Sequence, residues 1–170
     1  GKTRLARQAV ACLPSEPAGG TWFFELAAAR SVDEICMGVA TTLGLVLGHS
    51  DPVAQVGHAL AARGSMVVIL DNLEQCVDDL PATVGRWASL APEATLIGTS
   101  RVALRLLGER ELPVGPLTTD EGVALFLERS PVGVPTGDSD EIRSLVEALE
   151  GMPLAIELAA ARTRLLPVPE

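Results

Sequence analysis

The stretch MVVILD, residues 66–71, is apolar at five successive positions and ends in an acid. A short run that is apolar at every position is typical of a strand buried on both faces of a parallel sheet. Two other runs have a similar character, TWFFELA at 21–27 and TLIGTS at 95–100. Helical patterns separate the three runs, so the sequence predicts an α/β fold in which helices cover both faces of a parallel sheet.

Start and stop signals delimit the helices around these strands. SVDE at 31–34 and TTDE at 118–121 have the pattern of a capping box, and Asp51 followed by Pro52 is a third start signal. Helices are therefore predicted over residues 2–13, 32–45, 52–63, 79–90, 119–129, 139–150 and 153–166, and a fourth, shorter strand over 110–114.

The best candidate for a linker is SPVGVPTGDSD, residues 130–140, because it is rich in proline and glycine. This segment divides the chain into two predicted parts. The first, residues 1–130, is the α/β core, and the second, residues 131–170, is the start of a small helical subdomain.

Composition limits the classes of function. A chain of 170 residues that is 48% hydrophobic can bury a core. The formal net charge of -9 argues against direct contact with nucleic acid, since such contact depends on clustered basic residues. The three cysteines, Cys12, Cys36 and Cys76, are far apart and are interpreted as buried thiols in a reducing compartment. We find neither a signal peptide nor a membrane span, so a cytoplasmic location is expected.

Polar residues follow two of the predicted strands at the sheet edge where ligands of parallel sheets bind. Asp71, Asn72 and Glu74 follow the strand at 66–70, and the sequence TSR at 99–101 follows the next. Four apolar residues and an acid form the Walker B pattern, in which Asp71 points a carboxylate at the Mg²⁺ carried by ATP. Taken singly, Asp71 is also compatible with a plain strand-end turn, and Arg101 with a solvated loop arginine.

The chain begins with GKTRLA, residues 1–6, which matches the end of a phosphate-binding loop of the form GxxxxGK[ST]. Lys2 is the single lysine of the chain, and a compact ammonium suits the position between two phosphates. The backbone N–H groups from Gly1 to Arg4 would contact phosphate oxygens, and the Thr3 hydroxyl would take a metal position beside Asp71. The predicted ligands are ATP or ADP with Mg²⁺.

Four stretches carry a resemblance to a known family. GKTRLA, VVILDNLEQC at 67–76, LIGTSRVALRLLGERELPVGPL at 96–117 and GMPLAIELAAAR at 151–162 follow one another in that order. Together they resemble the nucleotide-binding domain of the AP-ATPase (NB-ARC-like) branch of STAND P-loop NTPases, as in bacterial AfsR/LuxR-type transcriptional regulators.

The resemblance implies roles for further residues. Arg101 would act as a sensor that contacts the γ-phosphate, and Gly151, Pro153 and Leu154 would belong to a motif whose proline packs near the adenine. From the residues alone, GMPLA is also compatible with one helix that ends at a glycine and a second helix that begins at a proline. The family resemblance further implies a signal-transduction switch, in which ATP/ADP exchange selects between a closed and an open, partner-binding arrangement. Its expected partners are other domains of a longer chain, with possible ATP-dependent self-association.

Two departures from the family pattern change the expectation. The glycines and the strand that lead into the phosphate loop do not precede Gly1. We therefore expect a P-loop NTPase sheet without its first strand, and little nucleotide binding. Asn72 stands where a second acid is usual, so Glu74 is the candidate base, and the Asn72 amide could orient water instead.

Slow ATP hydrolysis by the intact site is the expected activity. Three alternatives stay open: a motor-type ATPase such as a helicase or AAA+ remodeller, a metabolic kinase, and a degenerate scaffold that no longer handles nucleotide. The Asn72 position and the acidic charge count against the motor, and we identify no substrate lid of a kinase.

We expect nucleotide binding to become clear when a strand and the glycines of a complete phosphate loop are added before Gly1. This change would restore both the β-phosphate cradle and a central strand of the sheet. Calorimetric titration of the two forms with Mg-ATP and with ADP measures the difference. Equally weak binding by both forms would contradict the nucleotide interpretation.

Overall fold

The computed structural model describes residues 1–130 and 139–162. The chain divides into two compact units, one formed by Lys2–Leu112 and the other beginning at Pro113. Within the described residues, no helix has both the length and the apolar character needed to cross a membrane.

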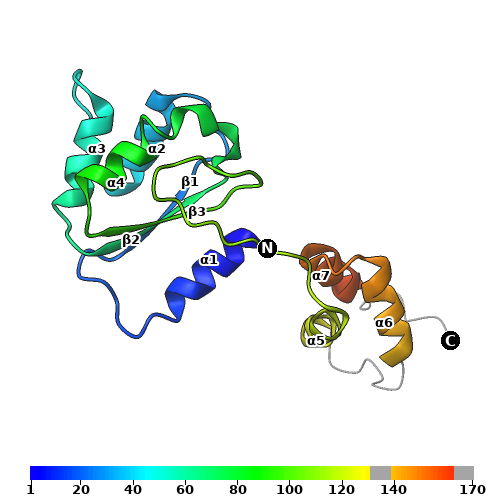
Figure 1. Ribbon diagram of the computed structural model, residues 1–170. Coiled ribbons are helices and arrows are strands. Elements are labelled where there is room, and N and C mark those ends of the chain that lie inside the picture. Colours follow the sequence, from blue (N-terminus) through cyan, green and yellow to red (C-terminus); the bar gives the residue numbers. More distant parts are fainter. Residues whose placement is uncertain (131–138, 163–170) are drawn as a thin grey trace. The chain divides into compact units, whose positions relative to one another are not determined.

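The first unit is built on a parallel sheet of three strands in the order β1-β2-β3 (Figure 1). The strands are β1 (Thr21–Glu25), β2 (Met66–Asp71) and β3 (Ala94–Gly98). Phe23 pairs with Ile69, and Ile69 pairs in turn with Ile97, so the middle of each strand lies in one row. The predicted α/β class and these three strands are confirmed.

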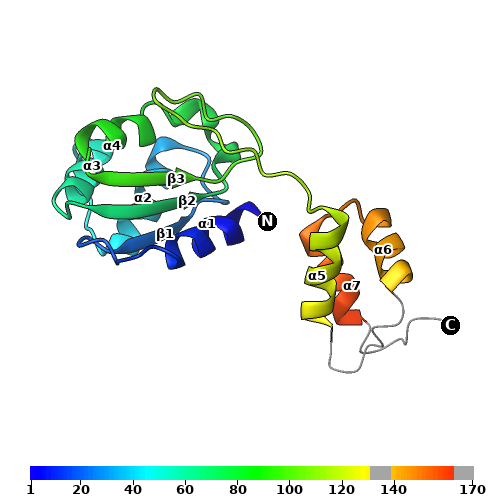
Figure 2. The same ribbon diagram turned by 60° about the horizontal axis from the view of Figure 1, so that its bottom comes forward.

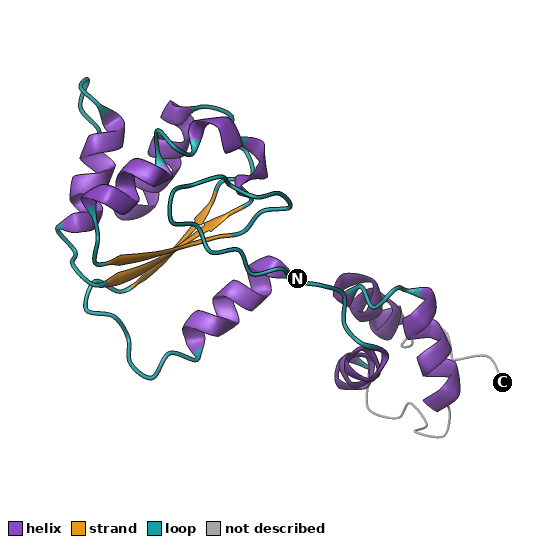
Figure 3. Cartoon of the chain, in the orientation of Figure 1, coloured by secondary structure: helices purple, strands orange, loops and turns teal. Residues whose placement is uncertain are grey.

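Helices lie on both faces of this sheet (Figures 1 and 2). On one face are α2 (Val32–Leu43), α3 (Pro52–Ala61) and α4 (Val84–Leu90). On the other is α1 (Lys2–Ala11), which buries Ala6 and sets the Arg7 guanidinium 3.8 Å from the centre of the Phe23 ring. The layered arrangement of helix, sheet and helix is also visible in Figure 3.

Strand β2 is buried at every position, which explains its continuous apolar run. Met66, Val68 and Leu70 belong to the main core cluster with residues of α2, α3 and α4. Val67 and Ile69 alternate with them, are buried as well, and point to the face that α1 covers. Because the residues of β2 pack into the core on both faces of the sheet, the strand is apolar at every position before Asp71, where it ends.

Both predicted capping sequences begin a helix. Before α5 (Thr119–Arg129), Thr118 and Glu121 form the complete reciprocal capping box. Before α2, the Ser31 hydroxyl accepts a hydrogen bond from Glu34 N, but the Glu34 carboxylate accepts from Arg30 N, one residue earlier than the motif requires. The second box is therefore only half formed.

Two predicted elements are wrong. The helix expected over 79–90 begins only at Val84, because residues 73–79 form two short 3₁₀ turns, η1 (Leu73–Gln75) and η2 (Val77–Asp79). The strand expected over 110–114 is absent. Residues 110–116 are exposed, so pairing there would bury nothing, and Pro113 has no N–H to donate to a ladder.

The cysteines follow the prediction at two positions out of three. Cys36 and Cys76 are buried, and Cys12 is exposed. Burial, together with the negative charge of Asp33, raises the pKa of the Cys36 thiol to about 11. Burial also raises the pKa of the Cys76 thiol. Both buried thiols therefore stay protonated near neutral pH and serve as apolar core groups.

The second unit contains α5, α6 (Ser139–Ala148) and α7 (Pro153–Arg162). The three helices share one small core, made by Phe126, Ile142, Val146, Ile156 and Ala160. The division at Leu112 differs from the predicted boundary at residue 130, because α5 buries Phe126 against α6 and α7. Residues 131–138 of the linker predicted over 130–140, and the predicted helix end at 163–166, lie outside the described residues, and Ser139 and Asp140 already belong to α6.

Gly151 lies at the end of the turn between α6 and α7, where the backbone of Leu117 leaves no room for a side chain. Its φ is +63°, and a Cβ at this position would lie 2.2 Å from the carbonyl oxygen of Leu117. The same two residues are joined by a hydrogen bond from Leu117 N to Gly151 O, 2.9 Å long. The glycine of GMPLA therefore has a structural role in the helical unit.

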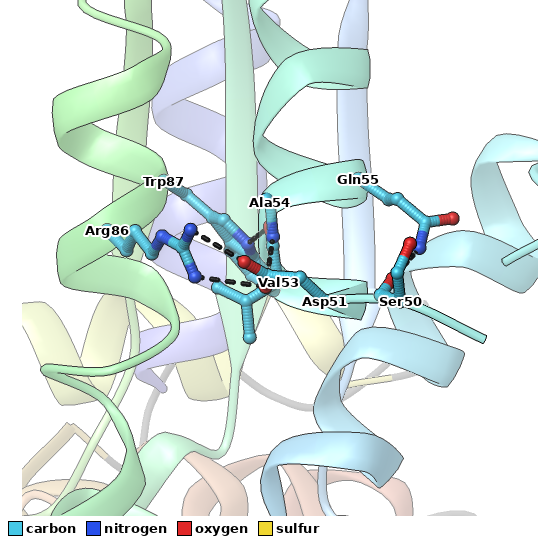
Figure 4. A network of polar contacts seen from close by, with 7 residues as sticks. All are labelled: Ser50, Asp51, Val53, Ala54, Gln55, Arg86 and Trp87. Carbon is cyan, nitrogen blue, oxygen red and sulfur yellow. Dashed lines mark hydrogen bonds and ion pairs between the residues drawn. The ribbon is translucent and has the colours of Figure 1, made fainter. Parts of the chain in front are cut away.

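A polar network joins α3 to α4 (Figure 4). Asp51 caps α3 by accepting from Ala54 N, and it accepts from both terminal nitrogens of Arg86 at 2.9 and 2.7 Å. In the same network Gln55 donates to Ser50 O. The Arg86 bonds, and next the Ala54 N–H, lower the pKa of the Asp51 carboxyl below 3.8.

We expect Asp51→Asn to lower the free energy of unfolding of the first unit near neutral pH. A lowered folded-state pKa gives stability that is present above 3.8 and is lost as the pH falls through the folded value. The difference between wild type and variant should therefore shrink in acid. Urea unfolding followed by circular dichroism at several pH values measures it, and a difference that persisted in acid would contradict the assignment. Arg86→Gln, alone and combined with Asp51→Asn, is the matched control.

Candidate functional site

The candidate site lies at the carboxyl edge of the sheet. Asp71 ends β2 and pairs with Glu25 at the end of β1, while Thr99 directly follows β3. The first turn of α1 reaches the same edge, because the Thr3 hydroxyl donates to Asp71 Oδ1 at 2.7 Å. Residues 68 positions apart in the sequence thus meet at the place predicted for ligand binding.

Asp71 is a buried carboxylate, with 5% of its surface exposed. Its Oδ1 atom accepts from Thr3 Oγ1 and from Thr99 Oγ1, the latter at 2.5 Å. In the described part of the chain, no basic side chain forms an ion pair with it. The two hydroxyl donors hold the carboxylate in position at the carboxyl edge of the sheet.

Thr99 is a site residue whose role was not predicted from the sequence. Its hydroxyl donates to Asp71 and accepts from Asn72 N at 3.1 Å. Its backbone accepts from Leu73 N and donates to Leu70 O, which continues the pairing of the two segments beyond the strands. The position of the Thr99 hydroxyl directly after β3 was a sequence signal for a site residue. That it bonds to Asp71 could be learned only from the register of β2 with β3.

Glu74 and Arg101, the predicted base and sensor, contact each other. Arg101 Nε lies 3.3 Å from Glu74 Oε1. The Glu74 side chain is 14% exposed and the Arg101 side chain 82%. Asn72, which precedes η1, has a left-handed backbone with φ 64° and turns the chain sharply after Asp71. The turn carries Glu74 away from the direction of β2 and toward the loop that follows β3.

The remaining predicted residues lie at two locations. Gly1, Lys2 and Arg4 are exposed in or next to the first turn of α1, the turn that also carries Thr3. Pro153 is the first residue of α7 in the second unit, where its missing N–H suits a helix start. Among the predicted residues, the fold brings Thr3 together with Asp71, and Glu74 together with Arg101.

The residues present fit a Mg²⁺ ion. Among residues 1–130 and 139–162, no group of three or more histidine, cysteine or acidic side chains could hold a metal by itself. Mg²⁺ does not require such a group, because it keeps several waters and takes phosphate oxygens beside one or two protein oxygens. The Thr3 hydroxyl and the Asp71 carboxylate supply two oxygens of that kind.

Comparison with known proteins identifies relatives in mycobacteria. The chain is 33% identical over 171 residues to an uncharacterized protein of Mycobacterium tuberculosis (strain H37Rv), a match that covers 96% of this chain and 43% of that protein. It is 31% identical over 170 residues to a protein of the same strain named "Putative HTH-type transcriptional regulator", of which the match covers 19%. The chain thus spans less than half the length of these relatives. No protein-family profile matches it.

Proposed function

We propose that this chain is the nucleotide-binding switch module of a STAND NTPase, which binds ATP or ADP with Mg²⁺ and hydrolyses ATP slowly. The observation that carries the proposal is the hydrogen bond from Thr3 Oγ1 to Asp71 Oδ1. It joins the residue after Lys2 at a helix start to the acid at the end of a buried strand. A Mg-nucleotide needs these two oxygens side by side.

Each residue has a proposed role. The ammonium of Lys2 and the backbone N–H groups from Gly1 to Arg4 bind phosphate oxygens. Thr3 and Asp71 hold Mg²⁺, which supplies positive charge against the phosphates. Arg101 contacts the γ-phosphate. A water is activated by Glu74 or oriented by the Asn72 amide, and the Pro153 ring packs near the adenine.

The proposed context is a multidomain bacterial transcriptional regulator. It is supported by the relative that carries the regulator name and extends well beyond the matched region. In this role, bound nucleotide would bias how the module packs with other domains of a longer chain or with a second copy. A ligand can shift such an equilibrium only through contacts that differ between the two states.

We expect Lys2→Ala to weaken nucleotide binding by about ten- to a hundredfold, in the form with the completed phosphate loop. One charge-assisted contact to phosphate contributes on the order of 1.5 to 3 kcal/mol. Arg4→Ala should have a much smaller effect, because Arg4 is proposed to act through its backbone N–H. Calorimetric titration with ADP measures both, and a larger loss for Arg4→Ala would contradict the proposed position of the loop.

Turnover separates the switch from the motor-type alternative. Phosphate release should be slow, and added DNA or RNA should not change it, since the chain is acidic. Fast release stimulated by nucleic acid would favour a helicase or remodeller instead.

A further inference from the structure

The contact between Glu74 and Arg101 is held in position by the backbone on both sides. Leu73, which precedes Glu74, is fully buried, and its N–H donates to the carbonyl oxygen of Thr99 at 3.0 Å. Arg101 lies two residues beyond Thr99. The segments that carry the two charged groups are therefore fastened together next to the ion pair, and the fold itself brings the charges within 3.3 Å.

The two partners depend on the contact unequally. The Arg101 side chain is 82% exposed, so water solvates its guanidinium even when the pair is broken. The Glu74 side chain is 14% exposed, so its carboxylate has less water to replace the lost cation. Turning Arg101 away from Glu74 therefore has a free-energy cost, and the cost falls mainly on the glutamate.

We propose that Glu74 is a specificity-determining residue, which lowers the preference for ATP over ADP by competing with the γ-phosphate for Arg101. The inference rests on the proposed function. ADP has no γ-phosphate and leaves the ion pair intact, whereas ATP must share or take the guanidinium. Because only contacts that differ between two ligands change their affinity ratio, the ion pair opposes ATP alone.

Glu74→Gln removes the competing charge and keeps the shape of the side chain. We expect it to raise the ratio of ATP-analogue affinity to ADP affinity by about two- to fivefold, the size expected for one solvent-accessible ion pair. A rise of this affinity ratio distinguishes the proposed competition from a purely catalytic role of Glu74. A residue that acted only as a base for hydrolysis would leave the affinity for a non-hydrolysable analogue unchanged.

A general electrostatic effect would act in the same direction, because the triphosphate carries more negative charge than the diphosphate. A double-mutant cycle separates the two causes. In the Arg101→Ala background the competition no longer exists, so Glu74→Gln should leave the affinity ratio unchanged. Asp78→Asn is the matched control for charge, since Asp78 is exposed four residues later and pairs with no described residue.

The affinities are measured by calorimetry on the form with the completed phosphate loop, with a non-hydrolysable ATP analogue and with ADP, both in the presence of Mg²⁺. The expected result is a rise of the ratio for Glu74→Gln that disappears in the Arg101→Ala background, and no rise for Asp78→Asn. An equal rise in both backgrounds, or no rise at all, would overturn the inference and leave the proposed function standing. Absence of binding by the wild-type protein with the completed phosphate loop would overturn both.

Discussion

Asp71→Asn is expected, in the form with the completed phosphate loop, to weaken Mg-ATP binding by about a hundredfold and to change metal-free ADP binding far less. The amide keeps the shape of the carboxylate but lacks the charge that a divalent cation needs. In the fold, Asp71 is buried and its Oδ1 atom accepts the hydroxyls of Thr3 and Thr99. Calorimetric titrations of the wild type and the variant, with Mg-ATP and with ADP in the absence of metal, measure the two losses of affinity. The difference between these losses is the effect of the substitution on metal binding.

The same substitution should leave the folded state intact, which separates function from stability. An asparagine oxygen can accept both threonine hydroxyls, and the variant no longer buries a charge that pairs with none of the described basic side chains. The free energy of unfolding in metal-free solution should therefore be equal to that of the wild type or higher. Glu25→Gln is the matched control, because Glu25 is an exposed acid paired with Asp71 across the sheet. Equal losses of Mg-ATP and metal-free ADP binding by Asp71→Asn would remove the metal role.

Trp87→Ala is expected to destabilise the first unit by about 3 to 5 kcal/mol, the range for truncating a large buried aromatic. The Trp87 side chain is 0% exposed, and its indole N–H donates to Val53 O at 2.9 Å. It also lies against Gly57, where a Cβ would be 3.3 Å from the ring. The indole thus fills the contact between α3 and α4, and alanine would leave a cavity there.

Urea unfolding followed by circular dichroism measures the Trp87 effect, and Trp87→Phe is the matched control. Phenylalanine keeps most of the apolar contact and loses the hydrogen bond, so its cost should be clearly smaller. Arg86→Ala, on the exposed side of α4, should cost less still. A Trp87→Ala variant as stable as Arg86→Ala would contradict the proposed packing.

The sequence by itself determined the three strands and the acid that ends the central one. A strand buried on both faces must be apolar at each position, so the run that leads to Asp71 could be recognised without knowledge of its neighbours. Local hydrogen bonds likewise made the start of α5 predictable, because Thr118 and Glu121 lie within one turn of each other. These signals are short in range and need no tertiary partner.

Only the tertiary structure decided which residues meet. Thr99 binds Asp71 across 28 positions of sequence, and Asp51 binds Arg86 across 35, so neither contact leaves a pattern in its own segment. The boundary between the units was mispredicted for the same reason, since burial of Phe126 depends on α6 and α7 rather than on α5 itself. The ion pair of Glu74 with Arg101 likewise depends on the register of β2 with β3, which extends through the backbone of Thr99. Hydrophobic period and capping are properties of a segment, whereas contacts between segments follow from the register and packing of the whole sheet.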